Sequence, residues 1–321
     1  MKTSVALCTY NGEKYIKQQL DSILKQTVPV DEIIVCDDGS TDTTISIINS
    51  YQKQYPEIFK VHINEQNLRS VKNFEKAVSL CTNEIIFLSD QDDIWIDEKV
   101  QIYLNHFNKN PNISVIASNG YGIDENDNIL NVITIWDVIP FIRKTGKELN
   151  YFEIISFSGN IATGATMAIK KDFIQKTIPF PMVPEFHHDE WIALIAASEN
   201  KFDFLDTKTF YYRQHQNQQV GGVFFENTEK RKDRLIKFFN PNFNDISFSN
   251  YKHILKRTCN SYKKNVGLLN NTTIHRNIFI KNIELFEGIF HKYKHEMMKK
   301  YPFRSFFLNI SDKINNKRQL K

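Results

Sequence analysis

The chain has 321 residues, 41% of them hydrophobic and 24% charged, which is long enough to bury a core in one large domain or two smaller ones. No apolar run approaches the roughly 18 residues needed to span a bilayer, and residues 4–8 are too short an apolar run for a signal peptide, so we expect a cytoplasmic protein. Charge divides the chain, since residues 1–221 hold 20 Lys and Arg against 29 Asp and Glu (net −9) and residues 222–321 hold 21 against 8 (net +13). We therefore expect two regions with different roles.

The first region alternates between two hydrophobic periods. Short apolar runs predict buried strands at residues 4–8, 32–36, 60–63, 84–88 and 114–118. Between these runs, apolar residues recur with a helical period, in stripes that begin at Ile16, Val71 and Val100. Strands that alternate with helices predict an α/β fold, a mainly parallel sheet with helices on both faces.

Polar clusters follow three of the predicted strands at their carboxyl ends: TYNGE (9–13), DDGSTD (37–42) and SDQDD (89–93). Ligands of such sheets bind at these ends, beside a topological switch point, so we expect the clusters to line one crevice. That crevice would hold the carboxylates of Asp37, Asp38, Asp90, Asp92 and Asp93. Crowded carboxylates are stable only where a cation or bound donors offset their repulsion, and oxygen ligands suit Mg²⁺ or Mn²⁺.

Each cluster also has a purely structural interpretation. In DDGSTD, Gly39 can supply a tight bend while Thr41 or Asp42 caps the next helix. Asp97 can cap the helix after SDQDD, but the aspartates before it exceed what a cap requires. A single DxD triplet is a weak signal, because acidic loops are common, whereas two acidic clusters behind two strands of one sheet favour a binding site.

Three successive stretches, ALCTYNGEKYIKQQLDSILKQT, DEIIVCDDGSTDTT and NEIIFLSDQDDIW, resemble the family 2 nucleotide-sugar glycosyltransferases, in particular their bacterial rhamnosyltransferase-like branch. Downstream, NIATGATMAIKK (160–171) is similar to the family's acceptor-side loop, HHDEWIALIAA (187–197) to its base motif and YYRQHQNQQVGG (211–222) to its YRQH segment. Gln218 and Gln219 depart from the usual pattern. The resemblance implies a GT-A-like (Rossmann-like) catalytic domain over residues 1–221, but it does not specify the sugar.

For the donor nucleotide, the resemblance implies a pocket bordered by residues of the first two clusters. It places Thr9, Tyr10 and Glu13 beside the nucleotide. It implies that Asp38, together with Asp37, bonds the base.

For the diphosphate, the resemblance implies a bound Mg²⁺ or Mn²⁺. Asp92 would coordinate this metal, and Asp90 would lie on its metal or ribose side. Asp93 either joins them or holds the loop. In the YRQH segment, His215 would contact the metal or a phosphate, although a solvent-exposed loop histidine fits the same sequence.

For the acceptor, the resemblance implies Asp189 as the catalytic base, with Gly164, Trp191 and Arg213 on the acceptor or sugar side. An Asp with its reference pKa of about 3.9 is ionised at neutral pH and can take the proton of the attacking hydroxyl. Asp189 can also simply favour the positive N-terminus of the helix that follows. For His187 and His188 we expect local hydrogen bonding, because H-H-D lacks the spacing of a helical metal site.

A second enzyme class stays open at this point. DQDDI nearly matches the D-x-D-x-T/V motif of haloacid-dehalogenase-like phosphotransferases, in which Asp90 would be the nucleophile. Against it, the fifth residue is Ile94, and the motif follows the fourth predicted strand rather than the first.

The basic region 222–321 contains helix-compatible stretches at 226–239 and 276–300 that mix cations with aromatic residues. It predicts a helical C-terminal region, either packed on the catalytic domain or contacting the inner face of the cell membrane as a peripheral protein, or even a non-enzymatic membrane-binding protein. No nucleic-acid motif accompanies the charge, so we expect no nucleic-acid partner. We therefore expect an inverting glycosyltransferase of bacterial surface-polysaccharide synthesis, with a nucleoside-diphosphate sugar as donor and a saccharide or lipid-linked saccharide as acceptor.

Overall fold

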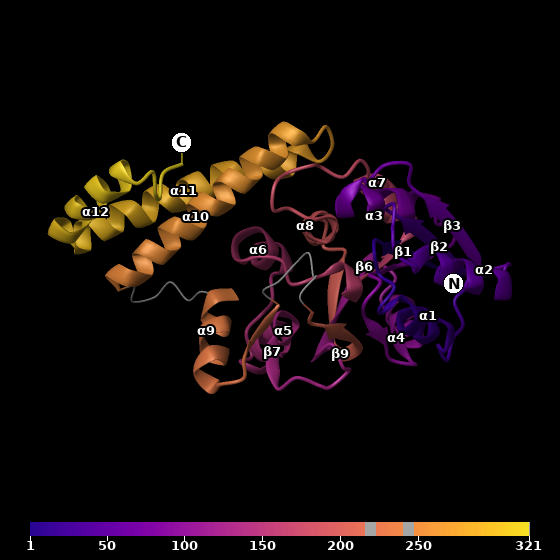
Figure 1. Ribbon diagram of the computed structural model, residues 1–321. Helices are drawn as coiled ribbons and strands as arrows, with labels where there is room; N and C mark the ends of the chain where they lie inside the picture. The colour runs from indigo at the N-terminus through magenta and orange to yellow at the C-terminus, as the bar shows by residue number, and fades with distance from the viewer. Residues whose placement is uncertain (216–222, 240–246, 321) are drawn as a thin grey trace.

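The computed structural model describes residues 1–215, 223–239 and 247–320, and Figure 1 shows how their elements are arranged. Its main sheet has eight strands within these residues, in the order β3-β2-β1-β4-β8-β6-β9-β5. These strands are β1 (Thr3–Thr9), β2 (Glu32–Asp37), β3 (Phe59–Ile63), β4 (Ile85–Ser89), β5 (Ile94–Trp95), β6 (Val115–Ile123), β8 (Ala168–Lys170) and β9 (Phe202–Arg213). A separate sheet pairs β7 (Val132–Thr134) with β10 (Phe224–Glu226).

The strands β3, β2, β1 and β4 run parallel. The chain leaves β1 for β2 and β3 and then returns to β4 on the other side of β1, which makes a topological switch point beside β1. Every residue of β1, β2 and β4 is buried, as expected for strands covered on both faces. Beyond β4 the sheet is mixed, because β8 is antiparallel to both its neighbours and β5 is antiparallel to β9.

Helices cover both faces of this sheet. Figure 1 shows α1 and α4 on one side of the strands and α3, α7 and α8 on the other. The helices of the first region are α1 (Ile16–Leu24), α2 (Thr44–Gln54), α3 (Arg69–Leu80), α4 (Lys99–Lys109), α5 (Val138–Lys144), α6 (Tyr151–Glu153), α7 (Lys171–Thr177) and α8 (His188–Ser198), with short turns η1 (Ile135–Asp137), η2 (Ile154–Ser158) and η3 (Gly164–Thr166).

The C-terminal region is helical, as predicted, and consists of α9 (Glu229–Phe239), α10 (Phe248–Asn271), α11 (Arg276–Lys300) and α12 (Pro302–Ile314) within the described residues. Helices α10 and α11 lie side by side and hold a small core of their own, which includes Leu255 and Phe290. Leu235, Leu268 and Phe279 belong instead to the main core. The C-terminal helices therefore pack on the first region; the expected boundary at residues 221 and 222 lies outside the described residues.

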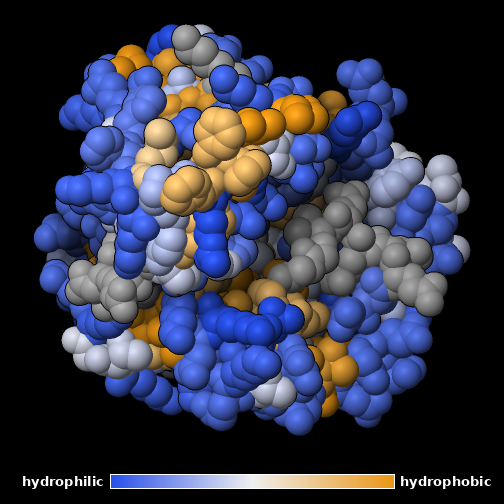
Figure 2. Space-filling model, turned by 90° about the vertical axis from the view of Figure 1, so that its left-hand side faces the viewer, coloured by the Kyte–Doolittle hydropathy of each residue, from blue (hydrophilic) through white to orange (hydrophobic). Residues whose placement is uncertain are grey.

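Helix α12 turns its apolar side outward. It buries Ser305 and Asp312, which are 1% and 7% exposed. The large apolar side chains on its other side are exposed by 44% to 83%, and we call them the α12 apolar face: Phe303, Phe306, Phe307, Ile310 and Ile314. In Figure 2 apolar side chains are grouped on this side of the molecule among hydrophilic ones.

The five predicted strands are found as β1, β2, β3, β4 and β6, but the expected burial is wrong for β3, which lies at the edge of the sheet and is mostly half-buried or exposed. The helical stripes are confirmed as α1, α3 and α4. The sequence stretches 226–239 and 276–300 correspond to α9 and α11. None of the helices in the described residues is both long enough and apolar enough to cross a membrane.

Candidate active site

A cavity of about 850 Å³ opens at the carboxyl ends of β1 and β4. The first three polar clusters reach it through Thr9, Asp38 and Asp92, among other residues. The later motifs reach it through Gly164 and Asp189, so segments more than 100 residues apart in sequence share one cavity. The expectation that the clusters line a single crevice is confirmed, but of the five carboxylates expected there only those of Asp38, Asp90 and Asp92 belong to its lining.

Gln91, the middle residue of DQD, lines the cavity and joins two of the loops around it. Its side-chain amide accepts a hydrogen bond from the backbone N of Tyr10 (2.8 Å) and donates one to the backbone O of Tyr10 (3.0 Å). A Cβ on Gly12 would lie 2.3 Å from Gln91 Oε1, so only glycine leaves room for this bridge. The bridge joins the loop after β1 to the loop after β4. Tyr10 itself is 43% exposed at the rim.

The two aspartates of DDGSTD have different surroundings. Asp37 is fully buried and accepts hydrogen bonds from Thr9 Oγ1 (2.6 Å) and the backbone N of Ser40 (2.7 Å), so its carboxylate holds the turn and is not part of the cavity lining. Asp38 does line the cavity. It accepts hydrogen bonds from the backbone N of Leu68 (2.7 Å) and of Arg69 (2.9 Å), at the start of α3.

Glu13 is turned away from the cavity lining toward α2. Its Oε2 accepts hydrogen bonds from the backbone N (2.9 Å) and Oγ1 (2.6 Å) of Thr43, and Asp42 Oδ1 accepts one from the backbone N of Thr44 (2.9 Å). Glu13 and Asp42 therefore cap α2, which supports the structural interpretation for the second half of DDGSTD.

The acidic loop after β4 puts two carboxylates into the cavity, those of Asp90 and Asp92. Asp92 Oδ2 lies 2.8 Å from His215 Nε2, so the YRQH histidine reaches the DQD loop. Burial raises the pKa of Asp90 to about 7, and the negative charges of Asp92 and Asp189 add to this effect. The crowding predicted from sequence is thus present in the structure.

The third acid of the loop, Asp93, is buried and outside the cavity lining. Its Oδ1 accepts a hydrogen bond from the backbone N of Arg213 (3.2 Å), which ties the acidic loop to the end of β9. Burial raises its pKa, and Asp92 and Asp90 raise it further. Behind it lies Lys99, whose Nζ donates to the backbone O of Ala165 (2.7 Å) and whose pKa burial lowers to about 7. This buried cation was not identified from sequence, since nothing local in the sequence distinguishes Lys99 from a surface lysine.

Two residues expected on the acceptor or sugar side are buried away from the cavity lining. Trp191 is fully buried, donates from Nε1 to the backbone O of Thr177 (2.8 Å) and stacks on Phe279 of α11 at 5.7 Å between ring centroids. Arg213 is 1% exposed; its Nε donates to the backbone O of Asp92 (2.9 Å), and its guanidinium also pairs with Asp127. Both side chains position the elements around the site.

The base candidate, Asp189, lies in the first turn of α8 and faces the cavity. Its Oδ2 accepts a hydrogen bond from the backbone N of Gly164 (3.0 Å), which joins the base motif to the acceptor-side loop. Burial raises the pKa of Asp189 to about 6, against the opposing influence of His187, the Gly164 hydrogen bond and Lys264. Asp189 is therefore still mainly ionised at neutral pH.

The cation beside this aspartate comes from the C-terminal region. Lys264 of α10 pairs with Glu190, which also lines the cavity, and its ammonium lies 5.1 Å from the ring centroid of Phe186. Burial lowers the pKa of Lys264 to about 8, while Asp189 opposes that shift. No local pattern predicts this pairing, because 74 residues separate Lys264 from Glu190.

His188 does not make the local hydrogen bond that we expected. It is 5% exposed and lines the cavity, and neither ring nitrogen has a hydrogen-bond partner in the described residues. Its ring stacks on Phe74 of α3, with centroids 4.0 Å apart and planes inclined by 20°. Burial lowers its pKa to about 3, so the imidazole is neutral at physiological pH.

No group of three or more His, Cys, Asp or Glu side chains in the described residues is arranged to hold a metal ion. The nearest arrangement is Asp92 with His215, and Asp90 lines the same cavity. Mg²⁺ characteristically takes one or two carboxylates and completes its shell with water and substrate phosphates. These donors therefore suit an ion that binds together with a diphosphate. Gln218 and Gln219 of the same segment lie outside the described residues.

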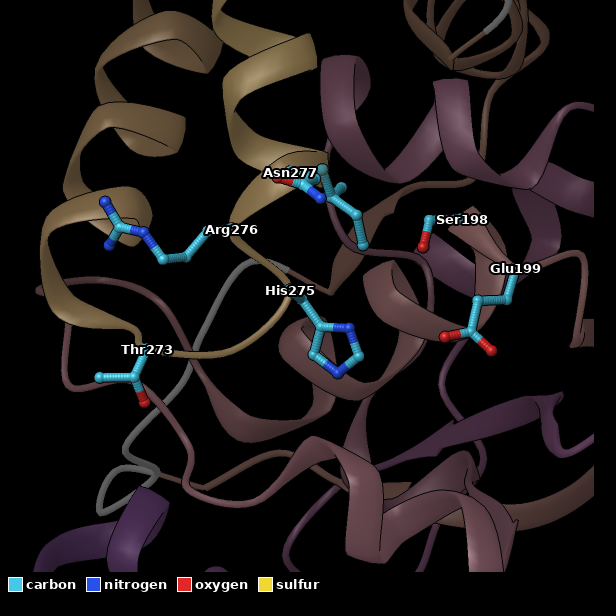
Figure 3. A pocket seen from close by; sticks show the side chains of 7 residues that line it. Ser198, Glu199, Thr273, His275, Arg276 and Asn277 are labelled. Carbon is cyan, nitrogen blue, oxygen red and sulfur yellow. The ribbon is translucent and has the colours of Figure 1, made fainter.

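A second pocket, of about 420 Å³, lies between the end of α8 and the turn from α10 to α11 (Figure 3). Its polar groups are largely satisfied within the protein. His275 Nε2 lies 2.9 Å from the backbone O of Lys176, and Arg276, which points away from His275 in the figure, donates to the backbone O of Leu269 (2.6 Å). This pocket gathers no set of groups comparable with the large cavity.

Known proteins share both the sequence pattern and the fold. The family description Glycosyl transferase family 2 matches residues 4–176, more than half of the chain. The dTDP-rhamnosyl transferase RfbG of Shigella flexneri is 31% identical over 239 residues, which cover 70% of this chain and 77% of RfbG. The haloacid-dehalogenase-like and non-enzymatic alternatives are not favoured by these matches.

Two solved structures resemble the chain in fold. One is S. aureus TarS 1–349 in complex with UDP-GlcNAc, with a TM-score of 0.54, 19% identity, and coverage of 90% of this chain and 72% of that chain. The other is the mannosyltransferase PcManGT from Pyrobaculum calidifontis in complex with GDP-Man and Mn²⁺, with a TM-score of 0.51, 13% identity, and coverage of 98% and 79%. The fold is therefore GT-A-like, and the chain belongs to glycosyl transferase family 2 and is a glycosyltransferase.

Proposed function

We propose that the protein is an inverting glycosyltransferase that moves a sugar from a nucleoside-diphosphate sugar to an acceptor hydroxyl. One observation carries the proposal: a single cavity holds the Asp90, Asp92 and His215 cluster together with Asp189. Such a transfer needs negative charge stabilised on the departing diphosphate and a carboxylate free to accept the hydroxyl proton.

On the donor side, Asp92 and His215 would hold a Mg²⁺ or Mn²⁺ ion, with Asp90 beside it. When bound, the ion supplies charge stabilisation to the diphosphate as a Lewis acid. Thr9, Tyr10 and Asp38 line the adjoining part of the cavity and would border the nucleotide. Asp37 and Glu13 would act indirectly, by fixing the turn and the start of α2.

On the acceptor side, Asp189 would take the hydroxyl proton as the oxygen attacks C1 from the face opposite the diphosphate. The hydrogen bond from Gly164 fixes the orientation of this carboxylate. Because its pKa of about 6 lies closer to neutrality than that of an ordinary Asp, Asp189 is a stronger base that is still mainly ionised at pH 7. Direct attack on C1 with no covalent sugar intermediate inverts the anomeric configuration.

We propose that the protein acts in the synthesis of a bacterial surface polysaccharide and that its acceptor is a saccharide or a lipid-linked saccharide. The support is the similarity to RfbG, whose name makes it a dTDP-rhamnosyl transferase. A dTDP-sugar is therefore the first donor to test, followed by UDP- and GDP-sugars.

We also propose that the protein contacts the anionic inner face of the cell membrane peripherally through α12. The α12 apolar face is exposed, and the region that carries it, residues 222–321, has a net charge of +13. Arg304 and Lys313 lie on the same helix. An exposed apolar helix face bordered by cations suits the surface of an anionic bilayer.

A thermal-unfolding screen tests the proposed function. dTDP-, UDP- and GDP-sugars are added to the whole chain with and without Mn²⁺, and the midpoint temperature is recorded. A ligand at 100 times its dissociation constant adds about 2.7 kcal/mol of stability, so one nucleotide class should raise the midpoint by a few degrees only when Mn²⁺ is present. If no sugar nucleotide changes the midpoint, the proposal fails.

A further inference from the structure

His188 is a buried polar side chain with unsatisfied hydrogen-bonding capacity next to the proposed base. It is 5% exposed, lines the large cavity and has no hydrogen-bond partner for either ring nitrogen in the described residues. Buried polar atoms are nearly always paired, and leaving one unpaired costs roughly 1–3 kcal/mol. A buried imidazole at a cavity wall with neither nitrogen paired therefore indicates a ligand that completes its hydrogen bonds.

Nε2 of the imidazole lies on the side of Gly164, and both ring nitrogens are buried. A Cβ on Gly164 would lie 3.1 Å from His188 Nε2 and 4.0 Å from Asp90 Oδ2. Both distances are measured from the same Cβ position. His188 Nε2 and Asp90 Oδ2 are therefore at most 7.1 Å apart, which is the sum of the two distances. With hydrogen bonds of about 2.8 Å, one hydroxyl joins two atoms that are up to about 5.6 Å apart, and two neighbouring hydroxyls join atoms at a wider separation, so separations up to this limit can be bridged.

The ring itself is held rigidly in this orientation. One face stacks on Phe74, with centroids 4.0 Å apart, and Phe180 lies beyond at 6.5 Å. The backbone is fixed as well, since His188 begins α8 and Asp189 beside it accepts the hydrogen bond from Gly164. A pre-oriented polar edge of this kind discriminates between ligands, because a ligand without the matching group leaves it unpaired.

The chemistry of a neutral imidazole narrows the class of ligand. It offers one donor and one acceptor, which complements a hydroxyl group, whereas a phosphate offers only acceptors. Burial lowers the pKa of His188 to about 3, which supports the neutral form. The acceptor Asp90 stands across the same space.

We propose that His188 is a specificity-determining residue for the donor sugar, hydrogen-bonding through its free edge to a hydroxyl of the transferred sugar between His188 and Asp90. This inference rests on the proposed function and deepens it, because it assigns a residue to the sugar rather than to the nucleotide or the metal.

The variant His188→Phe tests this inference, because phenylalanine keeps the stack on Phe74 and removes both nitrogens. Titration calorimetry with Mn²⁺ compares the sugar nucleotide that stabilises the wild type with the corresponding dTDP, UDP or GDP. The affinity for the sugar nucleotide should fall about tenfold, the effect of one lost hydrogen bond to a buried group, while the affinity for the free diphosphate changes less than twofold. His62→Phe, a half-buried histidine of β3 outside the cavity, is the matched control and should change neither.

Deoxy donors sharpen the test. A donor that lacks the contacted hydroxyl should bind wild type and His188→Phe equally, and His188→Gln, which keeps a donor and an acceptor, should recover part of the loss. An equal loss for the sugar nucleotide and the free diphosphate overturns the inference in favour of a phosphate, metal or packing role. No loss with either ligand overturns it as well. If no nucleotide binds the wild type, the proposed function itself fails, which is a different outcome from these two.

Discussion

The two regions of the molecule use apolar side chains in opposite ways. In the first region β1, β2 and β4 are buried throughout, and the polar residues gather where these strands end. In α12 the buried residues are Ser305 and Asp312, and the phenylalanines are outside. The first arrangement builds a polar cavity on a rigid apolar sheet, and the second builds an apolar surface on a basic helical region. We propose that the first arrangement serves the transfer reaction and the second the membrane contact.

The regions also differ in charge, and they meet beside the proposed base. Residues 1–221 carry a net charge of −9 and residues 222–321 a net charge of +13. Lys264 from the basic region pairs with Glu190, next to Asp189. The C-terminal region therefore contributes to the site, because it supplies the cation that pairs with Glu190 of the cavity lining.

The largest effect should come from Asp189→Asn, which removes the base and keeps the shape of the side chain. Sugar transfer should fall by roughly 10²- to 10⁴-fold, the range typical of general-base catalysis. Donor affinity and liposome binding should stay unchanged, because neither depends on proton transfer. Steady-state kinetics measures the transfer, calorimetry the donor affinity and vesicle co-sedimentation the liposome binding. Asp172→Asn, in the exposed first turn of α7, is the control, and a variant Asp189→Asn of normal rate would remove Asp189 from the mechanism.

Asp92→Ala should produce the second largest effect, and only on the first region. It removes the carboxylate that lies 2.8 Å from His215, so Mn²⁺-dependent binding of the nucleoside diphosphate should fall by more than the roughly 10- to 100-fold typical of a lost outer-shell partner. The fold should remain, because Asp92 lies at a cavity wall. Calorimetry with and without Mn²⁺ measures this loss. Asp97→Ala is the control, because it removes a carboxylate that forms an exposed ion pair with Lys25. An equal loss of nucleotide binding in this variant would mean that the overall negative charge of the loop, and not a specific site at Asp92, is responsible.

The double variant Phe306→Ser/Phe307→Ser tests the proposed membrane contact through the α12 apolar face. Each exposed phenylalanine that enters a bilayer interface contributes on the order of 1 kcal/mol or more, so affinity for vesicles rich in anionic lipid should fall about 10- to 100-fold. Transfer to a water-soluble acceptor should be unaffected. Vesicle co-sedimentation measures the binding, with Ile129→Ser, exposed in the first region, as control. Unchanged vesicle binding with a lower oligomeric state would assign the face to a second copy of the chain.

A smaller, pH-dependent effect should follow from Lys264→Met, at the junction of the two regions. Removing the cation leaves Glu190 negative beside Asp189, so the pKa of Asp189 should rise above about 6, by about 1 unit. Because the base must be deprotonated, the rate at pH 6 should fall several-fold while the rate at pH 8 barely changes. A pH–rate profile checks this shift. Lys263→Met, on the exposed side of α10, should leave the profile in place, and an equal loss at both pH values would indicate a packing role.

The sequence predicted the parts of the site that depend on local pattern. Apolar runs followed by acidic turns place Asp38, Asp90 and Asp92 at the ends of strands, and parallel topology then brings them together. The residue types in a sequence motif do not specify which of its side chains face the cavity. Trp191 and Arg213 belong to the same motifs as Asp189 and His215, yet they are buried away from the cavity lining.

Other features depend on contacts between distant segments. β9 pairs with β6 through register shifts at Ser118 and Asn119, which no local period reveals. Lys264 reaches Glu190 only because α10 packs on the first region. The sequence left open whether the C-terminal helices pack on the first region or expose their aromatic residues, and the structure shows both, since α10 and α11 contribute to the main core while Phe303, Phe306 and Phe307 of α12 are exposed.

The anomeric configuration of the product distinguishes inversion from retention, because the proposed mechanism has the diphosphate and the base on opposite sides of the sugar within one cavity. Once the donor and acceptor are known, proton NMR of the product reports the configuration at C1. This configuration is stable during the measurement, since C1 is held in a glycosidic bond and does not mutarotate. An α-linked donor should give a β-linked product, and a β-linked donor an α-linked one. Retention of configuration would require a nucleophile on the other face of the sugar and would contradict the assignment of Asp189 as the base.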